Sequence, residues 1–127
     1  DKIYQWTLDI PYAFSSTNYG MTYDGRTAVL SGETILRNMS FNDTGDRLFI
    51  IGAANDAIFE YSVSIPFDVT STLTELSRYS VLNQVESEND VNATLENNPV
   101  GLFWTNSGLF FSGINKDEVQ KINFVDK

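Results

Sequence analysis

Carboxylates are the most abundant groups in this chain that could perform acid–base or metal chemistry. Its 127 residues include 17 Asp and Glu side chains but no Cys and no His. This composition excludes disulfides and zinc sites of the common Cys and His type. Catalysis would therefore depend on carboxylate, Lys, Tyr or Ser groups without a His base.

The segment Asp43–Asp46 (DTGD) is the first candidate for such chemistry, because oxygen-rich loops bind calcium. Calcium takes about six to eight oxygen ligands, and this short segment offers too few. A later segment of the same pattern, Thr105–Gly108 (TNSG), carries no carboxylate. We therefore expect Asp43–Asp46 to be a tight turn, in which Gly45 supplies a positive φ.

A second acidic group lies in the Asn-rich segment Leu82–Asn98, where Glu86, Glu88 and Asp90 are close together in sequence. A solvated surface loop explains it more simply than a partly filled metal site. Glycoside hydrolysis needs two carboxylates at a defined separation, and nothing in the sequence fixes such a pair. No catalytic or metal-ligating residue is assigned, ligand-binding residues remain unknown, and no cofactor is expected.

The formal net charge of −9 and the pI near 4.2 bear on the possible partners. Nucleic-acid affinity comes largely from Lys and Arg contacts to phosphates, and anionic membrane surfaces likewise attract basic proteins. Neither partner is expected. The apolar runs are also too short for a membrane-spanning helix.

The elements that must position any site are revealed by an internal repeat. Residues 1–17 (DKIYQWTLDIPYAFSST) align without a gap with residues 56–72 (DAIFEYSVSIPFDVTST), and residues 117–124 (DEVQKINF) repeat the start of the pattern. Self-similarity at a long fixed period indicates a repeat architecture.

The most complete repeat unit is predicted to form four short β-strands joined by hairpins. Runs of β-branched and aromatic residues are bounded by turn residues, and helix-length amphipathic patterns are scarce. Pro66 cannot donate to a sheet ladder and should end the third strand. The four expected strands are Leu36–Asn42, Leu48–Ala53, Ala57–Ile65 and Leu73–Val81.

The other copies hold parts of the same unit. Gly101–Thr105 matches the first strand at an offset of 63, and a hairpin shorter by two residues reduces the later offset to 61. The first copy holds only Ile3–Ile10 and roughly Asn18–Tyr23. We therefore predict strands in groups of two, four and three.

The aromatic residues at equivalent repeat positions are interpreted as core. Trp6 aligns with Tyr61 and Ile122, and Trp104 aligns with Phe41. Exchange among apolar types favours packing between repeat units over a sugar-stacking platform. The tyrosines of the weaker outer strands are candidate surface contacts, although packing is the simpler role; they are Tyr19, Tyr23 and Tyr79.

The repeat unit resembles a β-propeller blade. Phe41–Phe49 (FNDTGDRLF) is similar to the F-S-P-D-G-x-x-L-Y hairpin of YVTN, NHL and lactonase-like propellers. Ile65–Ser71 (IPFDVTS) resembles the L-S-T-P-W-D-I-S-T ending of propeller repeats in phage tail and fibre-associated proteins and in environmental sequences. The resemblance implies an all-β fold with blades of four antiparallel strands, about two and a fraction per chain. A β-sandwich is the alternative.

These expectations give one module over residues 1–127. Residues 1–35 hold the end of one blade and a connection, residues 36–98 one full blade and a connection, and residues 99–127 the start of the next. Because propellers have about four to eight blades, self-association or further blades would complete a ring.

Propellers host enzymes, lectins and scaffolds alike, so three functions stay open. The first is a non-enzymatic module for binding or structural assembly, with an unidentified glycan or protein ligand and an extracellular or virion-associated location. The second is a carbohydrate-binding, lectin-like propeller. The third is a lactonase- or glycosidase-like enzyme.

Overall fold

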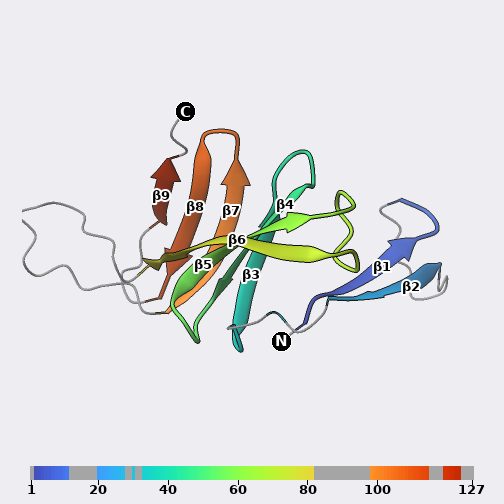
Figure 1. Ribbon diagram of the computed structural model, residues 1–127, viewed down its shortest axis with the longest axis horizontal. Helices are drawn as coiled ribbons and strands as arrows, with labels where there is room; N and C mark the ends of the chain where they lie inside the picture. Colours follow the sequence, from blue (N-terminus) through green and yellow to red (C-terminus); the bar gives the residue numbers. More distant parts are fainter. Residues whose placement is uncertain are drawn as a thin grey trace, which may run out of the picture.

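The computed structural model describes residues 2–11, 20–27, 30, 33–81, 98–114 and 119–123 (Figure 1). Within these ranges the chain forms nine β-strands in three antiparallel sheets. The three sheets contain two, four and three strands. This confirms the all-β prediction and the predicted grouping of the strands. No helix in the described ranges could cross a membrane.

The central sheet contains four strands in sequential order: β3 (Leu36–Phe41), β4 (Arg47–Gly52), β5 (Ala57–Val63) and β6 (Leu73–Ser80). Tight turns connect its first three strands, with a φ of 73° at Gly45 in one turn and 46° at Asp56 in the next. Strand β5 ends before Pro66, as predicted, since proline removes a ladder donor.

Two smaller sheets flank the central one (Figure 1). The hairpin consists of β1 (Tyr4–Leu8) and β2 (Met21–Arg26), and the third sheet consists of β7 (Pro99–Thr105), β8 (Gly108–Gly113) and β9 (Val119–Asn123). The predicted acidic loop lies almost wholly outside the described residues, as do Glu86, Glu88, Asp90 and Tyr19.

One strand is displaced from its prediction, because Asn18–Tyr23 was expected and β2 spans Met21–Arg26. The cause is a longer connection. Residues 9–20 separate the paired Leu8 and Met21, whereas only residues 64–72 separate the paired Val63 and Leu73. The gap-free alignment of the preceding strands concealed the extra residues.

Irregularities in the strand pairing recur at equivalent repeat positions. The register shifts between Gln5 and Trp6, and again at Glu60–Tyr61, which lies 55 residues later. It also shifts at Leu36–Asn38 and at Pro99–Gly101, which lies 63 residues later. Since a β-bulge bends its strand and increases the local twist, the copies share backbone shape as well as sequence.

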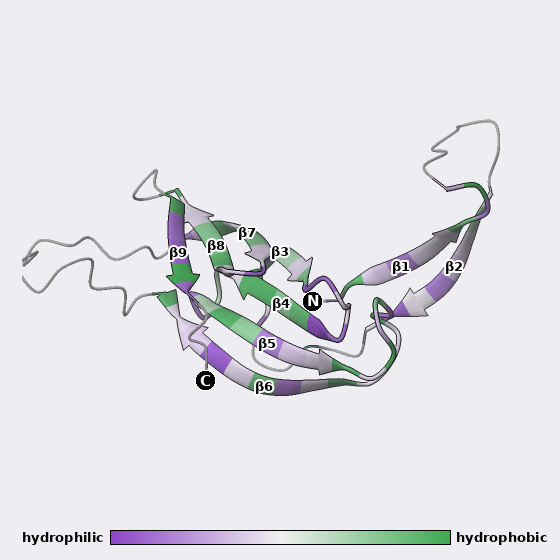
Figure 2. Ribbon diagram, turned by 90° about the horizontal axis from the view of Figure 1, so that it is seen from above, coloured by the Kyte–Doolittle hydropathy of each residue, from purple (hydrophilic) through white to green (hydrophobic). Residues whose placement is uncertain are grey.

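The two inner strands of the central sheet, β4 and β5, are buried on both faces. Leu48, Ile50 and Phe59 belong to a cluster on one face, with Leu30 and Tyr61. The other face contributes its own cluster and packs against the third sheet, in which the buried residues are Phe49, Ile51, Ile58, Val81, Leu102, Leu109 and Phe111. In Figure 2, β4 is coloured as hydrophobic along most of its length.

The central and third sheets pack face to face in a small sandwich-like arrangement. Strand β7 lies against β3 and β4. The backbone N–H of Trp104 donates to Oγ of Ser40 at 3.1 Å, which links the two sheets directly. Trp104 and Ile122 pack against the shared cluster.

Candidate functional site

The hairpin β1–β2 gathers its apolar side chains on one side. Successive strand residues point to opposite faces, so Tyr4, Trp6 and Leu8 share a side of β1. Their partners on β2 include Tyr23, opposite Trp6, and Met21, opposite Leu8. We call these five residues the aromatic face. Ring centroids lie 6.0 Å apart for Tyr4 and Trp6 and 5.4 Å apart for Trp6 and Tyr23, within the range of aromatic pairs.

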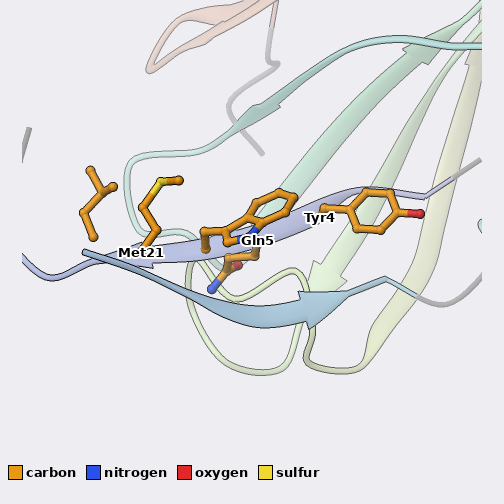
Figure 3. Close-up of a pocket in the computed structure, with 5 residues that line it drawn as sticks. Tyr4, Gln5 and Met21 are labelled. Carbon is orange, nitrogen blue, oxygen red and sulfur yellow. The ribbon is translucent and has the colours of Figure 1, made fainter. Parts of the chain in front are cut away.

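The aromatic face is open to solvent. The Trp6 residue is 50% exposed, and Tyr4, Met21 and Tyr23 are exposed to a similar extent. A hollow of about 520 Å³ lies along β1, lined by Tyr4, Gln5, Trp6, Leu8 and Met21. Figure 3 shows Met21 and Gln5 projecting to opposite sides of the hairpin. Such an apolar hollow suits an apolar or stacking ligand.

The opposite, polar side of the hairpin is tied to the central sheet. Oε1 of Gln5 accepts a hydrogen bond of 2.9 Å from the backbone N–H of Val69, in the β5–β6 connection. The Gln5 amide and the Thr7 hydroxyl both donate to Oδ2 of Asp24, at 3.2 and 2.9 Å. A Cβ at Gly25 would lie 2.9 Å from Cγ2 of Thr70, so the two segments approach closely. These contacts leave the aromatic face directed away from the connection.

The prediction that aligned aromatic residues form core is confirmed for four positions and wrong for Trp6. Tyr61 is buried, and Phe41, Trp104 and Ile122 pack against the buried clusters. Trp6 occupies the repeat position of Tyr61 but is half exposed. Tyr61 belongs to a buried cluster that includes Leu30 and Val63, whereas no described residue outside the hairpin belongs to a buried cluster with Trp6. Tyr23 and Tyr79 are also exposed, so the surface role fits them better than packing.

The prediction that Asp43–Asp46 forms a turn is confirmed. The amide of Asn42 donates to Oγ1 of Thr44 at 2.9 Å and to Oδ1 of Asp46 at 2.7 Å, and the Thr44 hydroxyl donates to the same carboxylate oxygen. The Phe67 ring covers Gly45, whose carbonyl accepts from the Phe67 N–H. Among the described residues no group of three or more His, Cys, Asp or Glu side chains could hold a metal.

The Asp46 network predicts an acid-sensitive component of stability. Hydrogen bonds from Thr44 and Asn42, aided by Arg47, lower the pKa of Asp46 below its ordinary value of 3.8. The folded chain therefore binds this proton more weakly than the unfolded chain, so the contribution is complete above about pH 4 and is lost as pH falls through the lowered pKa. We expect Asp46→Asn to flatten the pH dependence of unfolding below pH 4, measured by urea titration at several pH values. An unchanged slope would contradict this role.

One buried acidic group, Glu33, was not predicted from the sequence. Its residue is 1% exposed, and Oε1 accepts from the N–H groups of Ile35, at 2.7 Å, and Ala54, at 3.2 Å. The carboxylate lies directly against Gly52, where a Cβ could not fit. A signal existed: Glu96 follows Glu33 by 63 residues, and Gly113 follows Gly52 by 61. Glu96 lies outside the described residues.

Because comparisons with known proteins found no match, the function is inferred from the residues of the chain itself. No protein-family model, no curated protein and no solved structure matches the chain.

Proposed function

We propose that this chain is a non-enzymatic β-propeller-type module that acts in binding or structural assembly. The observation that supports this proposal best is the burial of the inner strands of the central sheet on both faces. A two-layer sandwich needs only one buried face per sheet, whereas a blade within a propeller is covered on both sides. The matching bulges support units that repeat around an axis.

The surface chemistry of the described residues also favours binding. One exposed apolar feature is the aromatic face, which offers stacking area and no nucleophile–base pair. The Asp46 carboxylate is held within its turn by Asn42 and Thr44, and Glu33 is buried against backbone amides. These carboxylates stabilise loops in the fold.

The proposal is tested with a panel of lactones and aryl glycosides, each with and without calcium. We expect no turnover above the rate in buffer. The matched control is Asp46→Asn, which removes one carboxylate and leaves the aromatic face unchanged. If the wild-type chain turns over a substrate and a carboxylate variant turns it over more slowly, the proposal is overturned in favour of the enzymatic alternative.

A carbohydrate-binding module is the second candidate, favoured by the half-exposed Trp6 and its stacked neighbours. Aromatic side chains whose rings are open to solvent can stack on the apolar face of a sugar, and Arg26 lies beside Tyr4 as a polar group at the edge. A glycan array separates the candidates. The lectin-like function is favoured if Trp6→Ala abolishes the binding signals and Tyr79→Ala retains them. An array without any binding signal would exclude this function.

A further inference from the structure

We propose that the aromatic face is a docking surface for a second copy of this chain. Its counterpart is the outward face of the third sheet, so the contact joins two different surfaces head to tail. This inference rests on the proposed function, because it assumes that the sheets are blades that pack face to face.

The template for the contact lies within the chain. The central sheet presents Phe49, Ile51 and Ile58 to the third sheet, where Leu109 and Phe111 complete a buried cluster. Two repeat units therefore already pack in a defined order. The face of one unit that carries Phe49 and Ile58 covers the opposite face of the next unit.

The outward face of the third sheet carries residues equivalent to Phe49 and Ile58, which lie on the face of the central sheet that covers the third sheet. Phe110 occupies the repeat position of Phe49, and Val119 occupies that of Ile58, both at the offset of 61. Phe103, directly opposite Phe110, is 64% exposed, and Val119 is 72% exposed. A surface that is buried in the central sheet is thus repeated here without a described cover. Contiguous exposed apolar surface of this kind marks interaction sites.

The aromatic face carries residues equivalent to those that are covered by a neighbouring sheet in the other two repeat units. Trp6 occupies the repeat position of Ile122, which packs into the contact between the central and third sheets, and Tyr4 occupies that of the buried Phe59. Figure 1 places the hairpin and the third sheet on opposite sides of the central sheet. The two surfaces of these residues therefore lie far apart, and the contact that we propose joins the aromatic face of one copy to the third sheet of another.

A head-to-tail contact has consequences that differ from those of a symmetric dimer. Two different surfaces that join copies generate closed rings or open chains. The formal charge of −9 on each copy opposes association, and added salt screens such repulsion. Association through this apolar contact should therefore strengthen as the salt concentration rises.

The test uses two variants that each block one surface. Trp6→Lys blocks the aromatic face, and Phe103→Lys blocks the outward face of the third sheet. Thr22→Lys is the control, since it adds the same charge on the polar side of the hairpin, opposite Thr7. Lysine lowers the net negative charge, so lost association cannot be attributed to added repulsion. Circular dichroism checks folding; if Trp6→Lys does not fold, Met21→Lys blocks the same face.

Size-exclusion chromatography with light scattering gives the result. We expect the wild-type chain and Thr22→Lys to exceed the monomer mass of 14.3 kDa, and each blocked variant to remain monomeric, with affinity reduced about tenfold or more. An equimolar mixture of the two blocked variants should form a complex of twice the monomer mass, because each retains the surface that the other lacks.

Three outcomes would overturn the inference: a monomeric wild-type chain at high concentration and high salt, a Phe103→Lys variant that associates like the wild type, or a mixture that stays monomeric. The second would indicate contact between two hairpins. None of these masses bears on the proposed function, which fails instead if the substrate panel shows turnover.

Discussion

Replacement of Phe59 by alanine should lower the free energy of unfolding by about 3–5 kcal/mol, the usual cost of removing a fully buried phenylalanine ring. Phe59 is 0% exposed and belongs to the cluster on one face of the central sheet. The Arg78 guanidinium also lies 4.6 Å from the ring centroid. Urea titration followed by circular dichroism measures the change.

The repeat itself supplies the matched control. Tyr4 occupies the position of Phe59 in the first copy but is 47% exposed. At a protein concentration low enough to keep the chain monomeric, we expect Tyr4→Ala to cost less than about 1 kcal/mol, since substitutions at exposed positions have small effects. Similar losses at both positions would show that the hairpin is covered as fully as the central sheet, and would contradict an open aromatic face.

Tyr4 and Phe59 also show which features of the fold could be predicted from the sequence and which could not. The alternation of apolar residues and the repeat register predicted that Tyr4 and Phe59 lie on equivalent strands, and β1 and β5 confirm it. Burial was not predictable in the same way. Pattern determines which face is apolar, whereas exposure depends on which other surface covers that face.

Replacement of Gly52 by alanine should also be strongly destabilising. A Cβ at this position would overlap Cδ of Glu33, which no real contact allows. Glu33 would have to move, and the backbone N–H groups of Ile35 and Ala54 would lose their acceptor. Strain and unsatisfied buried groups together predict a loss of about 2–4 kcal/mol in urea titrations.

A double-mutant cycle isolates the cause of that loss. If the clash with Glu33 is responsible, Gly52→Ala should cost much less in a Glu33→Ala background, and the coupling should be of the order expected for residues in contact, about 0.5–3 kcal/mol. Gly20→Ala is a milder control, because its Cβ would meet Asp9 at 3.2 Å. Additive losses at Gly52 and Glu33 would refute the proposed close contact.

The burial of Glu33 was not predictable from its local sequence, for a physical reason. A single Glu next to an expected strand resembles any solvated surface residue, and acidic side chains are rarely buried without partners. Its burial depends on two backbone donors and on a glycine that only the folded chain brings together. The Asp43–Asp46 turn, by contrast, is built from adjacent residues, so local turn chemistry sufficed to predict it.

Repeat-equivalent packing buries the inner strands of the central sheet, β4 and β5, on both faces. Methyl-labelled protein tests it directly through nuclear Overhauser effects between side chains. We predict cross-peaks from Ile51 and Ile58 to Leu102 or Leu109 on one face, and from Ile50 to Leu30 on the other, as the two clusters require. Cross-peaks on only one face would contradict the claim and would indicate a simple two-layer sandwich.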